Sequence, residues 1–214
     1  VHVQSPDAVT VPTAMHAFAA MNEKWGKLGF DTVLEPTIHY AQAGVPVAPR
    51  VAFDWVDASK ILQGAGKKHY LINGQIPKAG DIFYAPGQAE VLKRIAKYGV
   101  KAFYEGEIAD DMLTALQSLG GVHTAEDFAN VTSEETAPIN GDYKGTELFE
   151  HPPNGQGATA ILLLNILKHF DIAAMDPLGS ERAHIEAEAA KLAYDARNRF
   201  LADPDHTEKL DHML

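Results

Sequence analysis

The 214 residues of the sequence include no cysteine. This absence excludes disulfide bonds, thiolate metal sites and a cysteine nucleophile. It leaves the compartment open between periplasm and cytoplasm, because a chain without cysteine folds equally well in oxidising and in reducing surroundings. Any chemistry that the chain performs must therefore come from other side chains.

Basic residues are scarce, and long apolar runs are missing. Lysine and arginine number 18 against 29 aspartates and glutamates, and the formal net charge is -11. The longest basic run is Lys67-Lys68, whereas nucleic-acid binding normally needs clustered lysine and arginine. The longest apolar stretch, Ala158 to Leu164, is too short to span a bilayer. The sequence therefore predicts neither a nucleic-acid nor a membrane partner.

Two motifs that could signal a cofactor do not meet its requirements. Gly64-Ala65-Gly66-Lys67-Lys68 looks like a phosphate loop, but such a loop needs glycine where Ile61 stands and serine or threonine in place of Lys68. We interpret it as a solvated basic loop. His184 and Glu188 would share a helix face, but a metal site needs three or four converging ligands. A surface pair is the better interpretation, and neither a metal nor another cofactor is expected.

Most of the chain has helical periodicity. Apolar side chains recur every three or four residues, and glycine or proline ends most runs. The predicted helices cover residues 12–25, 32–42, 49–62, 88–98, 101–119 and 158–167, and a long final helix that Ser180 caps. Gly106 is expected to divide residues 101–119, and residues 64–82 are expected to form an irregular loop. Thr124 begins an N-cap sequence, although a capping box usually closes with Glu or Gln rather than Asp127.

One pair of segments reads as strands. Thr132 to Ile139 and Tyr143 to Glu150 are strand-like, and Asn140-Gly141-Asp142 between them is a strong hairpin signal. These patterns by themselves support an acidic α+β domain that is mainly helical. They include no catalytic triad, metal constellation or cofactor fingerprint.

The segment Asn154-Gly155-Gln156-Gly157 is the most suggestive local element. It follows a strand and two prolines and opens a buried helix. Bare backbone N–H groups at a helix N-terminus attract anions such as a substrate carboxylate, and glycine allows close backbone approach. Asn154, Gly155, Gln156 and Gly157 are therefore candidate substrate-binding residues. The competing interpretation is a tight strand-to-helix turn whose glycines serve geometry alone.

A series of motifs follows a fixed order along nearly the whole chain. The series includes Val9-Thr10-Val11-Pro12, Phe103-Tyr104-Glu105-Gly106-Glu107-Ile108-Ala109, Asp142-Tyr143-Lys144-Gly145, Pro152-Pro153-Asn154-Gly155-Gln156-Gly157 and Asp203-Pro204-Asp205. In this order and spacing, the chain resembles the large subunit of the gamma-glutamyltranspeptidase family. It departs from the family at Thr13, where glycine is usual, and at Asp195-Ala196-Arg197, where Ala-Asp-Arg is typical. These departures indicate a divergent branch.

The resemblance implies an N-terminal nucleophile hydrolase, in which two stacked sheets lie between helical layers and a precursor cuts itself. Residues 1–214 would be a single domain, the mainly helical portion of that αββα sandwich, with a β-hairpin near residues 132–150. The nucleophile would be the N-terminal threonine of a small subunit, with its own α-amine as base. That threonine would lie after the region matching Leu214, and the family's substrate-gripping arginine before the region matching Val9. No catalytic residue is therefore expected in this chain, which alone would be inactive.

Three hypotheses about function follow from the resemblance. The leading one is an enzyme that attacks an amide carbonyl and forms an acyl-threonine ester, with gamma-glutamyl compounds such as glutathione as default substrates. Related amidohydrolases and acylases, which cleave oxamate amides or cephalosporin side chains, resemble the chain equally well. The third is a non-catalytic helical interaction protein. The expected partners are the small subunit and a small-molecule amide, with a homo-oligomer as a further expectation, and the family resemblance implies a bacterial source.

Overall fold

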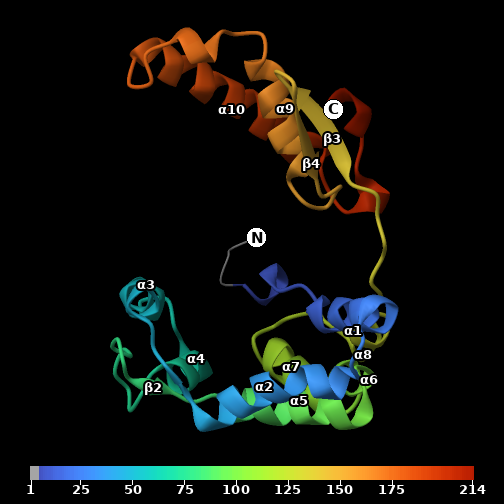
Figure 1. The fold of residues 1–214 in the computed structure, drawn as a ribbon. Helices are drawn as coiled ribbons and strands as arrows, with labels where there is room; N and C mark the ends of the chain where they lie inside the picture. The colour runs from blue at the N-terminus through green and yellow to red at the C-terminus, as the bar shows by residue number, and fades with distance from the viewer. Residues whose placement is uncertain (1–4) are drawn as a thin grey trace. The chain divides into compact units, whose positions relative to one another are not determined.

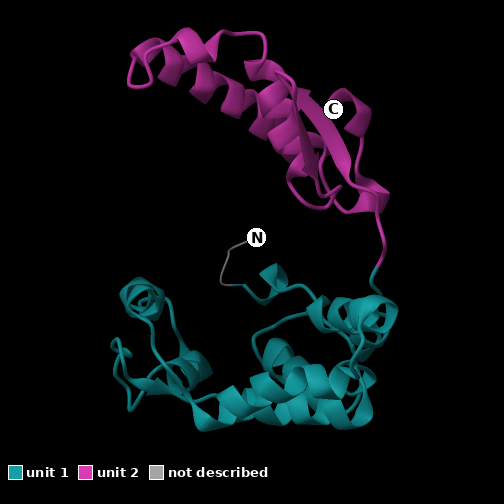
Figure 2. Ribbon diagram, viewed as in Figure 1, with its two compact units in different colours: residues 1–133 teal, residues 134–214 magenta. Residues whose placement is uncertain are grey.

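The computed structural model describes residues 5–214, which fold as two compact units with the boundary along the chain between Ser133 and Glu134 (Figure 1 and Figure 2). Unit 1 is built mainly from helices and has one very short strand pair, whereas unit 2 sets a β-hairpin against two helices. This mainly helical α+β composition with a hairpin confirms the predicted class. That residues 1–214 act as a single domain stays a prediction.

Unit 1 follows the helical periodicity of its sequence closely. The elements are α1 (Ala14–Trp25), α2 (Phe30–Ala43), β1 (Val45–Pro46), α3 (Pro49–Ser59), α4 (Gly64–Tyr70), β2 (Ile82–Phe83), α5 (Pro86–Tyr98), α6 (Lys101–Tyr104), α7 (Glu107–Ser118) and α8 (Ala125–Ala129). The strands β1 and β2 pair antiparallel. Gly106 separates α6 from α7 as predicted, because its φ of 77° is a conformation that glycine adopts without strain.

The core of unit 1 consists of two linked apolar clusters. One is centred on Phe128, which is fully buried, and contains Tyr104 and Leu113. The other joins α2 to α5, the two helices that pack most extensively, through Leu34 and Ile95. Met15 and Phe103 contact both clusters, so that the apolar interior is continuous across the unit.

The prediction of an irregular loop from Gly64 to Ile82 is wrong in its first part, where α4 forms. Lys67, Lys68 and His69 occupy the last turn of this helix. Cations are favoured there, because they interact with the negative end of the helix dipole. The basic run is therefore a helix end rather than a loop.

Two helix starts differ from the sequence expectation in detail. The N-cap at Thr124 is confirmed, and its capping box closes with Asp127 in place of the usual Glu or Gln: Thr124 N donates to Asp127 Oδ2 over 2.7 Å, and Asp127 N donates to Thr124 Oγ1 over 3.3 Å. Ser180 was expected as a cap, but it is the first helical residue of α10. Gly179 is the N-cap instead, with extended backbone and no side-chain bond.

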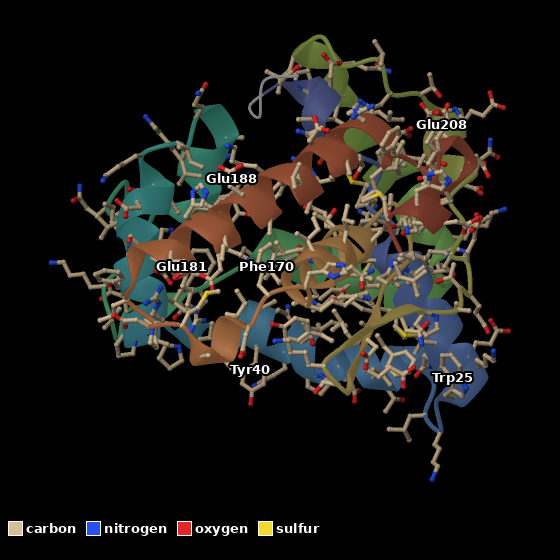
Figure 3. The ribbon with its side chains drawn as sticks, turned by 90° about the horizontal axis from the view of Figure 1, so that it is seen from above. Trp25, Tyr40, Phe170, Glu181, Glu188 and Glu208 are labelled. Carbon is tan, nitrogen blue, oxygen red and sulfur yellow. The ribbon has the colours of Figure 1, made fainter. Side chains whose placement is uncertain are left out.

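Unit 2 is a hairpin and two helices stacked on one another. Its elements are β3 (Ile139–Tyr143), β4 (Thr146–Glu150), α9 (Gly157–Leu167) and α10 (Ser180–Phe200). The hairpin packs on α9, and α9 packs on α10. Ala189 and Ala193 are the buried residues of α10, so the two helices can approach closely. Figure 3 shows Glu181 and Glu188 along α10.

The hairpin turn lies four residues later than the sequence predicts, and the strand that was expected from Thr132 begins only at Ile139. The turn is Lys144-Gly145, with φ values of 52° and 84°, the pair of positive angles that a two-residue type I′ turn requires. Gly141 lies within β3, opposite Leu148. A Cβ atom at Gly141 would lie only 2.6 Å from Ile161 Cγ2, so its glycine serves the contact with α9 rather than the turn.

Candidate functional site

The four candidate residues 154–157 form the connection between β4 and α9. Gly155 N donates to the carbonyl oxygen of Pro152 over 3.2 Å, which closes a turn directly after the strand. The carbonyl oxygen of Gln156 accepts from Thr159 N over 3.0 Å, so that Gln156 is the N-cap of α9. The strand-turn-helix order is as the sequence predicts. That these residues bind substrate stays a prediction.

Gly157 has a structural function that is independent of any ligand. It is buried, and a Cβ atom there would lie 2.5 Å from both Glu150 Cβ and the carbonyl oxygen of His151. A side chain at this position would therefore force Glu150 or the His151 backbone to shift. At Gly155 the nearest atom would be 3.4 Å away, an ordinary contact. A steric requirement for glycine is therefore present at Gly157, whereas a Cβ atom at Gly155 would make only ordinary contacts.

The side chain of Gln156 forms a hydrogen bond with a residue from a distant part of the chain. Arg197 Nη1, in the last turn of α10, donates to Gln156 Oε1 over 3.1 Å. The guanidinium carbon lies 4.6 Å from the centre of the Tyr194 ring, and Arg197 Nε and Nη2 donate to Asn198 Oδ1 over 3.0 and 2.7 Å. Sequence reasoning missed this contact. The available signal was the stripe of Ala189 and Ala193 on α10, since Arg197 follows at the next helical step.

Arg197 also differs from the other arginines in its partners. Each of the four others forms an ion pair with a carboxylate: Arg50 with Asp54, Arg94 with Glu90 and Glu107, Arg182 with Glu186, and Arg199 with Asp195. The recorded contacts of Arg197 are with two neutral carboxamides and an aromatic ring. Its guanidinium therefore acts here as a set of directed donors.

Thr159 is a buried hydroxyl in the first turn of α9. The residue is 7% exposed, and its Oγ1 has no hydrogen-bond partner among the residues that the structure describes. A threonine nucleophile needs a neighbouring base to take its proton. The environment of Thr159 provides none within the described chain, so this hydroxyl is not a candidate for catalysis by the chain alone.

In the suggested pair of His184 and Glu188, the main partner of Glu188 is a third residue, Lys191. Lys191 Nζ donates to Glu188 Oε1 over 2.8 Å, and this hydrogen bond lowers the pKa of Glu188, with a smaller contribution from His184. Within residues 5–214, no group of three or more His, Asp or Glu side chains is placed to hold a metal ion. Nor does that part of the chain contain a helix long and apolar enough to cross a membrane.

The hollows of unit 1 include two of contrasting character, and the residues that line them are distant in sequence from the candidate turn. One, of about 440 Å³, is apolar and is lined by Trp55, Tyr70 and Phe83 among others. The second, of about 500 Å³, surrounds the charged side chains of Arg94 and Glu107. None of the residues 154–157 lines either hollow.

Comparison with known proteins covers the chain from end to end. A family model described as gamma-glutamyltranspeptidase matches residues 1–214. The "Glutathione hydrolase-like YwrD proenzyme" of Bacillus subtilis (strain 168) is 34% identical over 202 residues, which are 92% of this chain and 38% of that protein. The chain thus spans well under half the length of this relative.

The solved structures that share the fold include enzymes from Helicobacter pylori and Bacillus halodurans. Helicobacter pylori gamma-glutamyltranspeptidase superimposes with a TM-score of 0.85 at 27% identity, over 99% of this chain and 62% of that one. A cephalosporin acylase from Bacillus halodurans superimposes with a TM-score of 0.82 at 32% identity, over 96% of this chain and 40% of that one. The mainly helical part of the N-terminal nucleophile hydrolase fold is thereby confirmed. The chain belongs to the gamma-glutamyltranspeptidase family.

Proposed function

We propose that this chain is the large-subunit part of an amidase that acts through an acyl-threonine intermediate, with the threonine supplied by a segment outside these 214 residues. Two facts support the proposal. The whole chain matches the family model, and it spans only 38% of a proenzyme relative. Because the chain belongs to this family, we propose gamma-glutamyl amides such as glutathione as the first class of substrate to test.

The chemistry divides one difficult step into two easier ones. The threonine hydroxyl attacks the amide carbonyl carbon while the threonine α-amine takes its proton. The C–N bond then breaks, and the leaving amine departs with that proton, which leaves an acyl ester on the threonine. Water or a second amine attacks the ester carbonyl, which releases the acid or a new amide and restores the hydroxyl.

The contribution of this chain would be made by the turn at residues 154–157. Backbone N–H groups at a helix start are oriented donors, and donors of this kind stabilise a carboxylate or a developing oxyanion. Gln156 adds two further N–H donors from its carboxamide. We therefore infer that the turn lies close to the catalytic centre of the assembled enzyme.

The need for a partner is supported by the hairpin. A two-stranded hairpin is marginally stable on its own, and its outer strand edges are free to pair. Phe149 in β4 is 59% exposed. The start of α9, by contrast, is covered within the chain, since Ala158 and Ile161 are buried. We infer that the small subunit covers the hairpin rather than the start of α9.

The acylase alternative is kept because an acylase is among the similar proteins. The cephalosporin acylase of known structure is 32% identical to this chain and the glutathione hydrolase-like proenzyme is 34% identical, so sequence identity does not separate the two activities. The two activities share the acyl-threonine chemistry and differ in the acyl group. A direct comparison of substrates is therefore part of the test.

The test uses the full-length protein and the 214-residue chain in parallel. We expect the full-length protein to cleave itself, which mass spectrometry detects as a new N-terminal threonine, and then to hydrolyse a gamma-glutamyl anilide. The 214-residue chain should show no turnover. A higher kcat/KM on an acylated cephalosporin would favour the acylase. An uncleaved full-length protein without turnover of either substrate would overturn the proposal in favour of an interaction protein.

A further inference from the structure

The side-chain amide of Gln156 can face Arg197 in only one way. A guanidinium has five N–H donors and no acceptor. The atom of Gln156 that meets it must therefore be Oε1, as the 3.1 Å bond from Nη1 shows. The two N–H donors on Nε2 lie on the other branch of the carboxamide. Gln156 makes no side-chain cap bond to its own helix, so capping of α9 does not use these donors.

The guanidinium that sets this orientation is itself fixed. Its face lies over Tyr194, and its Nε and Nη2 atoms share Asn198 Oδ1. These residues are on α10, which packs against α9 with Ala193 buried one turn before Arg197. Arg197 is half-buried, so its freedom to choose another conformation is reduced. The orientation of Gln156 is therefore set by α10 rather than by its own turn.

We propose that Arg197 is a positioning residue for the reaction: it turns the carboxamide of Gln156 so that the Nε2–H donors bind an oxygen of the substrate carboxylate or carbonyl. This inference rests on the proposed function. It explains why Arg197 has neutral partners in a chain where the other arginines pair with carboxylates. A carboxamide can accept a hydrogen bond from Arg197 through its oxygen and still present N–H donors to the substrate. A carboxylate has only acceptors and could not do both.

A purely structural role predicts a different response to substitution. If the contact only joins α10 to the turn, replacing Gln156 by glutamate would strengthen it, because the pair becomes charged. If the Nε2–H donors bind substrate, the same change removes them and places a negative charge beside the substrate oxygen. Gln156→Glu therefore separates binding from stability.

The experiment measures kcat, KM and melting temperature in the full-length processed enzyme with a gamma-glutamyl anilide. Arg197→Met is expected to lower kcat/KM about tenfold, mainly through KM, which is the effect of losing one hydrogen bond to a charged group. Arg197→Lys, which keeps a donor but loses the planar fork, should retain part of the activity. Gln156→Glu should melt no lower than wild type and still lose at least as much kcat/KM as Arg197→Met.

Coupling between the two sites provides the decisive comparison. In a Gln156→Ala background, Arg197→Met should cause no further loss, since its effect passes through Gln156. Arg199→Met, two residues along the same helix, removes a cation paired with Asp195 and serves as the matched control that keeps wild-type kinetics. Should Arg197→Met fail to fold, Arg197→Lys and Gln156→Glu still give the answer.

The outcomes distinguish this inference from the function on which it rests. Full activity in Gln156→Glu, or independent multiplicative losses in the double variant, would overturn the positioning role and leave the amidase intact. A wild-type enzyme that turns over no amide would instead overturn the proposed function, and the inference with it.

Discussion

The hydroxyl of Tyr104 donates a hydrogen bond of 2.7 Å to the carbonyl oxygen of Pro12, 92 residues earlier in the chain. The hydroxyl oxygen of Tyr104 also accepts a hydrogen bond from His16 N over 3.1 Å. Burial raises the pKa of Tyr104, so the hydroxyl keeps the proton that it donates. A single phenol thus fastens the start of α1 to the short helix α6.

Tyr104→Phe should lower the free energy of unfolding of this chain by about 1–2 kcal/mol, because the Pro12 carbonyl oxygen loses its hydroxyl donor and His16 N loses one of its two acceptors. Urea denaturation of the variant and of the wild type measures the difference. Tyr40→Phe is the matched control, since Tyr40 is 58% exposed and should change stability by less than about 0.5 kcal/mol. Equal losses in both variants would contradict the prediction.

Acid should weaken the start of α8. The bond from Thr124 N holds the pKa of Asp127 below its ordinary value of 3.8. The ionised carboxylate therefore stabilises the folded state, fully above about pH 4, and the contribution is lost as pH falls through the folded pKa. Asp127→Ala should reduce stability at neutral pH and flatten the fall in stability between about pH 5 and about pH 3.

Denaturation midpoints measured across that range provide the test. Glu126→Ala, a change in the same turn that does not touch the capping box, should keep the wild-type pH profile. If wild type and Asp127→Ala lose stability in parallel on acidification, the carboxylate does not contribute as described.

The two glycines of the candidate turn should respond differently to alanine. Gly157→Ala should cost about 1–3 kcal/mol, because its Cβ would press on Glu150 and His151 in a packed site. Gly155→Ala has room and should change stability by less than about 0.5 kcal/mol. Chemical denaturation measures both, and a Gly157→Ala variant as stable as wild type would refute the packing argument.

The β-hairpin offers a test of why its turn lies where it does. Gly145→Ala should destabilise by about 1–2 kcal/mol, because its φ of 84° is strained for any residue with a Cβ. Gly141→Ala should destabilise through the clash with Ile161. In an Ile161→Ala background the loss from Gly141→Ala should shrink while that from Gly145→Ala persists. Identical behaviour in the two backgrounds would argue against the Gly141–Ile161 contact.

Local signals in the sequence were sufficient to predict the positions of most of the helices. The periodicity of apolar residues placed α1, α2 and α5, and the glycine at 106 correctly divided α6 from α7. These features depend on contacts between residues a few positions apart, and side-chain spacing records such contacts directly. The ordered motifs also identified the family, because order and spacing survive substitution at single positions.

Tertiary packing alone determined the remaining features. Asn140-Gly141 has the composition of a turn, yet the contact of Gly141 with Ile161 keeps it in a strand and moves the turn to Lys144-Gly145. Arg197 and Gln156 are 41 residues apart, and only the packing of α10 on α9 brings them together. Sequence patterns encode what each segment favours by itself, whereas these contacts depend on which surfaces of distant segments fit together.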